Sequence, residues 1–350
     1  MSGGVDSSVA AALLKERGFD AVGVHIKMWS DPSIPCNFKE DRYDALGTAE
    51  KIGIPFQTWD LTEEYRTAVV EYMIREYTAG RTPNPDVMCN REIKFGVFLR
   101  HARERGADFV ATGHYVRLHE DKSKKITDKK YALAIARDTN KDQSYFLWTL
   151  GQEQLRHCLF PIGEYTKTEV REMARKMRLP TAEKKDSQGI CFIGEIDLNA
   201  FLKKHIPMRP GLIGTTSGRI VGEHDGLSFY TIGQREGLGS GGGGIPYYVA
   251  EKDFLANTLV VAEGPYDEKL FSRAADVMNV HWIAGTPPRF PLRCDARIRY
   301  RQPLQQCSLK VSVQSASVRV IFDEPQRAVT PGQSIVFYRS EEMLGGGWIV

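Results

Sequence analysis

The first two hundred residues alternate short apolar runs with amphipathic stretches. Three runs have the pattern of buried strands: AVGVHIKMW (21–29), TWDL (58–61) and ADFVATGHY (107–115). Helical periodicity occupies the segments around them: 42–52, 62–78, 91–105 and 165–180. The last of these helices begins with a capping box, because Thr166 is followed three residues later by Glu169. This alternation predicts an α/β domain with a parallel sheet, whose ligands bind at the carboxyl ends of the strands.

The pattern changes after about residue 205, where glycine and proline become frequent and helical periodicity fades. Short alternating runs predict strands at 227–233, 246–253 and 257–264. From about residue 272 the pattern is wholly β, with a turn at PGQ (331–333) before a last strand, SIVFYR. A small barrel or sandwich accounts for this spacing. We therefore expect three domains, with boundaries near residues 205 and 272.

The composition is that of a soluble globular protein, with 350 residues of which 42% are hydrophobic and 26% charged. No apolar run approaches the length of a membrane span, and no basic-then-apolar signal segment is present, so we expect a cytosolic protein without a membrane partner. The six cysteines form no CxxC pair, which argues against a zinc ribbon or a cysteine-ligated cluster. In a reducing compartment they are free thiols, and a special one is expected to be reactive.

The net charge of +3 is small, but its distribution is uneven. Residues 117–141 hold eight Lys or Arg against four Asp or Glu, and residues 293–310 hold five against one. Two basic stretches far apart in sequence suit an extended polyanion. Solvated loops explain the first stretch equally well. They explain RIRYRQ (297–302) less well, because its arginines alternate along a strand-like segment with a tyrosine between them.

The opening segment MSGGVDSS has the composition of a phosphate cradle. Gly3 and Gly4 carry no side chains that would block a close approach to the backbone. The N–H groups of the turn, nearby hydroxyl groups and the dipole of a helix over about residues 7–17 all favour an anion. The hydroxyl groups come from three serines: Ser2, Ser7 and Ser8.

This cradle differs from the P-loop of kinases and GTPases, because the Gly-Lys-Ser/Thr ending is missing. Asp6 lies within it, and a carboxylate beside a phosphate makes sense if Mg²⁺ bridges the two. The alternative is a glycine-rich helix start that binds nothing. Two glycines, an acid and two serines rarely coincide in a plain turn, so we favour the phosphate cradle.

Seven motifs carry a resemblance to a known family. They occur in one order along the chain: SGGVDSS (2–8), RTPNPDVMCNREIKF (81–95), ATGHY (111–115), NKDQSYFL (140–147), KKDSQGICFIGE (184–195), YTIGQREGLG (230–239) and RYRQ (299–302). Together they closely resemble the tRNA-specific 2-thiouridylases, the bacterial MnmA family and its mitochondrial relatives, over nearly the whole chain. SGGVDSS alone marks only the wider group of PP-loop ATP pyrophosphatases, whereas PNPDxxCN combined with GICFIGE is highly specific.

The resemblance implies a fold and a reaction. The fold is an α/β PP-loop domain with a parallel sheet and a helical tRNA-binding extension (1–204), a small β-rich central domain (205–271) and a C-terminal β-barrel (272–350). The reaction is ATP-dependent 2-thiolation of the wobble uridine of tRNA, by adenylation of the C2 oxygen and sulfur transfer from a cysteine persulfide. An adenylate suits this chemistry, because a uridine carbonyl is a poor electrophile and its oxygen a poor leaving group.

ATP, with Mg²⁺, is therefore the expected cofactor, and no separate protein metal site is predicted. The ATP-binding residues implied by the resemblance are Ser2, Gly3, Gly4, Val5, Asp6, Ser7, Ile26 and Gly113. Ile26 stands where the family usually has methionine. It lies in a strand that contacts adenine mainly through its backbone, so we expect the change to be harmless.

The resemblance gives Cys191 the role of persulfide carrier and Cys89 that of the thiol that attacks its sulfur linkage or closes a disulfide behind it. One part of this has independent support. Asn84 and Pro85 have the cap and first-turn pattern of a helix, so Cys89 lies near a helix N-terminus, where thiolate is favoured. Asp86 lies one turn away and is a candidate general acid or base. The remaining cysteines are expected to be small buried hydrophobes: Cys36, Cys158, Cys294 and Cys307.

Contacts with tRNA follow from the same resemblance. The implied residues are Asn84, Pro85 and Asp86 at the target base, and His114, Lys141, Asp142, Gln143, Arg299, Tyr300 and Gln333 elsewhere. A base of the anticodon loop is unpaired, so it enters a pocket at a cost of a few kcal/mol at most. A protein that delivers persulfide sulfur is the second expected partner, and the sequence does not identify it. The sequence also does not specify the preferred tRNAs or the oligomeric state.

Two other functions remain open at this point. A PP-loop enzyme acting on a small molecule would use the same cradle, although the chain has no glutaminase-like segment and two cysteine motifs would be unexplained. A non-catalytic RNA-binding protein would not need the ATP cradle.

The position of Met1 raises a further expectation. Family members carry an apolar strand directly before the PP-loop, and Met1 stands where that strand should end. This strand is normally central in a doubly wound sheet, so its neighbours would lack ladder partners. We therefore expect the native chain to have a short apolar strand upstream.

Overall fold

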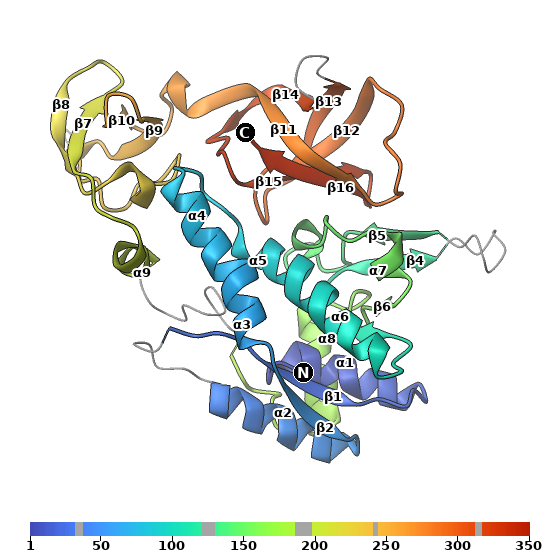
Figure 1. Ribbon diagram of the computed structural model, residues 1–350. Helices are drawn as coiled ribbons and strands as arrows, with labels where there is room; N and C mark the ends of the chain where they lie inside the picture. The colour runs from blue at the N-terminus through green and yellow to red at the C-terminus, as the bar shows by residue number, and fades with distance from the viewer. Residues whose placement is uncertain (32–37, 121–129, 186–197, 241–243, 312–316) are drawn as a thin grey trace.

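The computed structural model describes residues 1–31, 38–120, 130–185, 198–240, 244–311 and 317–350. Figure 1 shows the N-terminal α/β part below, the C-terminal barrel above and the small central sheet beside the barrel, reached through α9. The predicted order of α/β domain, β-rich central domain and C-terminal barrel is confirmed. In the described part of the chain, no helix combines the length and apolar character needed to cross a bilayer.

The α/β part holds two pairs of parallel strands. One pair is β1 (Gly23–Lys27) with β2 (Phe56–Asp60), and the other is β3 (Val110–Ala111) with β6 (Cys158–Leu159). The helices packed around them are α1 (Val5–Glu16), α2 (Phe38–Ile52) and α8 (Lys167–Lys176). The sequence predicted one parallel sheet, whereas the described residues form these two separate pairs. Met1 lies beside β1, where its amino group donates to the carbonyl of Val24, and the expectation of an upstream strand stays a prediction.

Two long helices form the extension that faces the barrel. The first runs continuously through α3 (Thr62–Tyr65), η1 (Arg66–Glu71) and α4 (Tyr72–Thr78), as the periodicity predicted. The second runs through α5 (Pro85–Met88), η2 (Cys89–Val97) and α6 (Phe98–Glu104). It starts earlier than the predicted residue 91, because Asn84 caps it and Pro85 occupies its first turn. The middle section of each helix has the wider π-helical turn.

The central domain is a four-stranded sheet that follows α9 (Leu198–His205). Its strand order is β8 (Ile220–His224), β7 (Gly211–Thr215), β10 (Thr258–Glu263) and β9 (Tyr247–Asp253). The predicted strand at 227–233 was wrong, because a short 3₁₀ turn, η5 (Leu227–Phe229), occupies this position. Its apolar side chains, Leu227 and Phe229, are buried in the core, so their spacing reflects packing instead of a ladder.

The C-terminal domain is a closed antiparallel barrel. Its strands, in spatial order, are β11 (Phe271–Trp282), β14 (Val318–Arg327), β13 (Gln305–Val311), β12 (Leu292–Arg297), β15 (Ser334–Arg339) and β16 (Glu342–Ile349), and β16 pairs with β11 to close it. The short turn η7 (Glu268–Leu270) leads into it. The sequence predicted 334–339 as the last strand, but β16 follows it. The glycines of β16 supply no side chains that would have signalled a strand.

A hairpin of the N-terminal domain extends the barrel sheet. It consists of β4 (Arg117–Glu120) and β5 (Tyr131–Ala134), and β5 pairs with β16. The turn η4 (Ser144–Phe146) and the helix α7 (Gln152–Leu155) lie nearby in the same core. Trp148 and Tyr145 are fully buried there, and both donate to Ser334 of the barrel, at 3.0 and 2.8 Å. The N-terminal domain and the barrel therefore share one sheet and one core.

Candidate functional site

The segment predicted as the phosphate cradle forms a tight turn at the start of α1. Gly3 has φ +83°, and a Cβ there would lie 2.3 Å from the carbonyl oxygen of Asp41, so only glycine fits. No side chain caps α1, and the Ser2 and Ser7 hydroxyl groups lie 3.0 Å apart beside the turn. Ser8 does not join them, because it is buried and lies 3.3 Å from Thr48 Oγ1.

Asp6 is held at the edge of this turn by two groups from distant segments. Lys167, the first residue of α8, donates from Nζ to both carboxylate oxygens, at 2.7 and 2.9 Å. The hydroxyl of Tyr115 donates to Oδ1 at 2.8 Å. An ammonium group therefore stands next to the predicted phosphate site. The Asp6 carboxylate has the oxygen ligands that Mg²⁺ prefers, so it fits a magnesium ion brought by ATP.

Gly113 lies directly against the cradle. A Cβ at this position would lie 2.7 Å from both the carbonyl carbon of Asp6 and the amide nitrogen of Ser7. The glycine that the sequence placed near the nucleotide is thus also needed for the backbone of the cradle to stay in place.

Replacing Gly113 with alanine is therefore expected to displace the cradle and weaken ATP binding by about tenfold or more, since overpacking costs roughly 1–3 kcal/mol. Gly47→Ala in α2 is the matched control, because its Cβ would meet only Pro180, at 3.8 Å. That control should leave ATP binding unchanged and stabilise the helix by about 0.5–1 kcal/mol. Isothermal titration with an ATP analogue measures both variants, and equal affinities would show that the cradle tolerates the methyl group.

The predicted catalytic residues Asp86 and Cys89 lie on the first turns of the second long helix. The Asn84 side chain accepts from the amides of Asp86 and Val87, at 3.2 and 3.3 Å, so the predicted cap is present. Cys89 follows one turn later and is 2% exposed, within a core that also contacts Ile26 of β1. The helix start predicted from Asn84 and Pro85 is confirmed. The Cys89 thiol is enclosed by apolar side chains.

The Lys94 ammonium affects the pKa values of both Asp86 and His114. Burial raises the pKa of the Asp86 carboxyl, and the Lys94 ammonium opposes this rise. Burial, with a smaller contribution from Lys94, lowers the pKa of His114 well below its usual value, so the ring is neutral. The His114 ring also lies 5.9 Å from that of Phe95, and Thr112 Oγ1 is 2.8 Å from its Nδ1. Gly113 therefore packs on the cradle and His114 follows it in the chain, while the Lys94 charge acts on both His114 and Asp86.

Asp142 and Gln143, both predicted to contact tRNA, have their side chains engaged within the protein. The Asp142 carboxylate is 2% exposed and forms an ion pair with Arg297 of β12. It also accepts from the amides of Ala136 and Ser144, at 3.1 and 3.2 Å. The Gln143 side chain accepts from the amide of Tyr115 at 2.9 Å. Their contacts with tRNA, like that of Lys141, stay predictions.

The barrel residues predicted to contact tRNA lie on turns next to the helical extension. Residues 298–302, predicted as strand-like, form a turn in which Arg301 has φ +63°. Arg299 donates to the carbonyl of Ala328 at 2.7 Å, and the ring of Tyr300 lies 4.6 Å from that of Phe146. Gln333 donates to the carbonyls of Thr82 and Pro83, at 2.8 and 3.1 Å, so it braces the segment before Asn84.

Comparison with known proteins assigns this chain to a family. Family models match along the chain in three consecutive segments, described as a tRNA methyl transferase HUP domain (residues 1–195), a tRNA methyl transferase PRC-barrel domain (199–263) and an aminomethyltransferase β-barrel domain (272–349). Proteins named tRNA-specific 2-thiouridylase MnmA from Streptococcus mutans and MnmA 2 from Geobacillus kaustophilus are 49% and 48% identical to it, over 100% of this chain and 93% of each relative. The chain belongs to the tRNA-specific 2-thiouridylase family.

Two further matches differ in how similar they are to this chain. The MnmA protein of Francisella philomiragia is 47% identical over 100% of this chain and 98% of its own length. A solved structure, NMN synthetase from Francisella tularensis, matches 53% of this chain and 63% of its own with 15% identity and a TM-score of 0.31. That likeness is too weak to support any conclusion.

The second cysteine motif of the 2-thiouridylase family is only partly described. Cys191 and Cys36 lie outside the described residues, as do the glycines 241–243 and the lysines of segment 121–129. Lys184, at the start of the motif, is described, and its Nζ donates to Asp41 at 2.7 Å and to Asp44. Asp41 is also the residue whose carbonyl lies against Gly3. The motif therefore begins beside the cradle.

Three charged residues in these family motifs or near them were not singled out by the sequence. Lys167 lies in the capped helix that the periodicity predicted, but nothing in its pattern indicates that it reaches Asp6. Lys94 is part of the quoted motif 81–95, and Arg297 belongs to the basic run. A basic residue immediately after a capping threonine is the one signal that could have identified Lys167.

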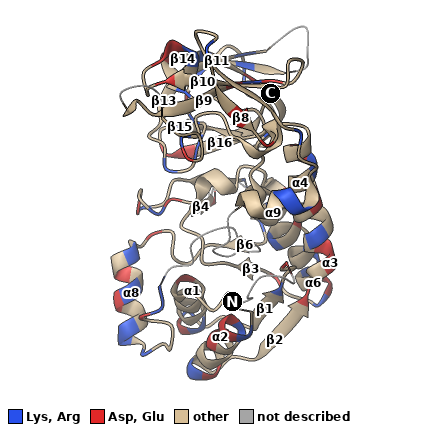
Figure 2. Cartoon of the chain, turned by 90° about the vertical axis from the view of Figure 1, so that its left-hand side faces the viewer, with Lys and Arg blue, Asp and Glu red and all other residues tan. Residues whose placement is uncertain are grey.

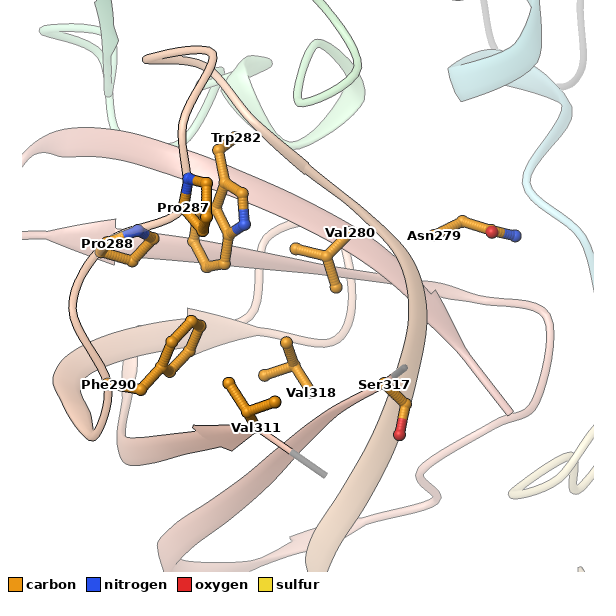
Figure 3. Close-up of a pocket in the computed structure, with 9 residues that line it drawn as sticks. All are labelled: Asn279, Val280, Trp282, Pro287, Pro288, Phe290, Val311, Ser317 and Val318. Carbon is orange, nitrogen blue, oxygen red and sulfur yellow. The ribbon is translucent and has the colours of Figure 1, made fainter. Parts of the chain in front are cut away.

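Two pockets are present in the described part of the chain, and none of the predicted site residues lines either. One, of about 520 Å³, is on the barrel, where Figure 3 shows Trp282, Phe290 and Val318 gathered around it. The other, of about 370 Å³, lies where residues 79–82, 250–254 and 328–331 meet.

Figure 2 shows basic and acidic residues interspersed along α8, so the surface of this helix is not a uniformly basic face.

Proposed function

We propose that this chain converts the wobble uridine of tRNA to 2-thiouridine in two steps. In the first, the C2 oxygen of the uridine attacks the α-phosphorus of ATP, and pyrophosphate leaves. In the second, the terminal sulfur of a persulfide on Cys191 attacks C2, and AMP leaves. Cys89 then attacks the sulfur of Cys191, which frees the thiolated base and forms a disulfide between the two cysteines. A dithiol and a protein that delivers persulfide sulfur complete the cycle.

One observation carries this proposal: Gly113 packs on the phosphate cradle, and its chain neighbour His114 is affected by the same Lys94 charge that acts on Asp86. This supports a common site for an ATP seated at the cradle and a uridine that reaches Asp86. Burial raises the pKa of Asp86, which moves it toward the range of a general acid or base near the target base. Free thiols at Cys89 and Cys191 require a reducing compartment, so we place the protein in the cytoplasm.

Pyrophosphate exchange into ATP is the direct test of the first step. Exchange that depends on tRNA, together with ATP-dependent incorporation of sulfur into that tRNA, is the expected result. Exchange supported by a small molecule without tRNA would favour the rival PP-loop synthetase. Binding of tRNA without any exchange would favour a non-catalytic RNA-binding protein. Methyl transfer to tRNA without ATP would instead favour the activity in the family model's description.

Lys167 is expected to contribute to ATP binding. Lys167→Met removes the ammonium beside Asp6, and hydrogen bonds to charged groups contribute about 1.5–3 kcal/mol, so the KM for ATP should rise roughly tenfold to a hundredfold. Lys176→Met at the exposed end of the same helix is the matched control and should leave that KM unchanged. Steady-state kinetics with tRNA in excess measures both. An unchanged KM in Lys167→Met would mean that this ammonium serves only to orient Asp6.

Arg299→Ala is expected to weaken tRNA binding and to reduce the slope of log affinity against log salt by about one unit, the loss of one phosphate contact. Arg319→Ala removes a surface charge from the same barrel, where Arg319 pairs with Asp276, and serves as the control. Binding titrations over a range of salt concentrations give the slopes. A slope that matches the wild type would remove Arg299 from the residues that contact the backbone, since its bond to Ala328 then explains its position.

A further inference from the structure

Two cysteines of the barrel face each other across neighbouring strands. Cys294 of β12 and Cys307 of β13 are directly opposed in the antiparallel ladder, and their sulfur atoms lie 3.8 Å apart. Both are free thiols in the barrel core, with exposed fractions of 7% for Cys294 and 0% for Cys307. Nothing in the sequence indicates this pairing, and each cysteine was expected to be a small buried hydrophobe. The structure instead places two reducing groups in contact.

Direct opposition in an antiparallel ladder is compatible with the backbone spacing of a disulfide. Opposed residues of an antiparallel ladder have Cα atoms about 4.5–5.5 Å apart, which falls within the range of about 4.4–6.8 Å found for disulfides. The sulfur atoms must approach from 3.8 Å to about 2.05 Å. Rotation of the two side chains about their Cα–Cβ bonds provides this movement without a shift of strand register.

We propose that Cys294 and Cys307 form a redox-sensitive dithiol, which a peroxide converts to a disulfide across β12 and β13. Cys294 reacts first, because it is the more exposed of the two. Its sulfur attacks one peroxide oxygen, the O–O bond breaks, and a sulfenic acid and one water form. The sulfur of Cys307 then attacks that of Cys294 and expels the hydroxyl group, which takes the proton of Cys307 and leaves as a second water. Two electrons pass from the thiols to the peroxide.

The chemistry of Cys307 suits the second position in this order. Its hydrogen bond with Cys294, followed by burial, raises the pKa of its thiol, so it remains protonated and does not react with peroxide directly. It becomes reactive only when a neighbouring sulfur carries a leaving group. Oxidation is therefore expected to be slow and to stop at the disulfide.

The disulfide would tie the base of the segment that carries Arg299 and Tyr300. β12 ends at Arg297, whose ion pair with Asp142 joins the barrel to the N-terminal domain, and β13 begins at Gln305. Closing this short loop reduces the freedom of the unfolded chain and so stabilises the barrel. Formation of the disulfide does not depend on the proposed function. An effect of the disulfide on tRNA binding would depend on it.

The test uses the full chain with Cys89 replaced by alanine and Cys191 by serine, so that the thiols of the proposed reaction do not interfere. The folded protein is treated with hydrogen peroxide, unfolded, alkylated and digested with trypsin. We expect a cross-link between the peptides CDAR (294–297) and QPLQQCSLK (302–310), which dithiothreitol removes. Cys158 should remain alkylated, because burial raises the pKa of its thiol to about 12 and it lies outside this pair.

Single variants make the result decisive. Cys307→Ala and Cys294→Ala should each abolish the cross-link, and both are used because one of them could fail to fold. Oxidised protein should also unfold at a temperature higher by roughly 5 °C, and neither variant should show this rise. Full alkylation of both cysteines after peroxide, or a sulfinic acid on Cys294 beside an intact Cys307 thiol, would overturn the proposal. An unchanged unfolding temperature in cross-linked protein would overturn its stabilising role.

Discussion

Replacing Cys89 or Cys191 with serine is expected to abolish thiolation of tRNA while leaving tRNA-dependent pyrophosphate release largely intact. Both thiols act after the uridine has been activated in the proposed scheme. A serine hydroxyl cannot carry a persulfide, and it is a far weaker nucleophile than a thiolate at neutral pH. The adenylated tRNA should therefore form and then decay by hydrolysis.

Two measurements on the same samples test this expectation. Pyrophosphate release reports activation, and analysis of nucleosides from digested tRNA reports 2-thiouridine. Cys158→Ser is the matched control, because Cys158 is also buried, and it should retain both activities. Cys89→Ala is added because Cys89 is 2% exposed, and a hydroxyl enclosed there could disturb folding. Loss of pyrophosphate release in both Cys89 variants would show that this thiol serves binding or folding instead.

Asp142→Asn is expected to lower the free energy of unfolding by about 3–5 kcal/mol, since it leaves the buried Arg297 guanidinium without its charge partner. Arg297 is 8% exposed, so water does not replace the carboxylate. The amides of Ala136 and Ser144, which donate to the Asp142 carboxylate, would also have a neutral and weaker acceptor. The effect is large because the ion pair joins the N-terminal domain to the barrel.

Chemical unfolding followed by tryptophan fluorescence measures this loss. The double variant Asp142→Asn with Arg297→Met should recover much of the stability, because it leaves no unpaired buried charge. Asp276→Asn breaks an exposed pair with Arg319 and should cost at most about 1 kcal/mol. If Asp142→Asn changed stability no more than Asp276→Asn did, and affected only tRNA affinity, its carboxylate would belong to the RNA-binding surface as the sequence predicted.

Local patterns in the sequence were sufficient to predict the parts of the site that form within a few residues of the chain. The turn at Gly3 and the cap at Asn84 each arise within a few residues, so spacing and residue type predicted them. The predicted strand at 227–233 failed for the opposite reason, because its apolar residues pack into the core from a 3₁₀ turn. Alternation alone does not distinguish these two cases.

Pairs formed by residues far apart in the chain could not be predicted in this way. Lys167 reaches Asp6 across 161 positions, and Arg297 reaches Asp142 across 155. Lys167 lies in a segment with the pattern of a solvated helix, and Arg297 lies in a basic strand-like segment. Only the fold brings the partner of each within reach. The same limit hid the contact between Cys294 and Cys307, whose strands are joined by a turn that had been predicted as a strand.

The β4–β5 hairpin has a consequence for anyone who would divide this protein into modules. Cutting the chain before the barrel would expose the edge of β5 that pairs with β16, together with Trp148 and Tyr145. An open edge beside uncovered aromatic side chains promotes aggregation. The N-terminal and barrel portions are thus expected to fold well only when they are expressed together, although family models describe them as separate domains.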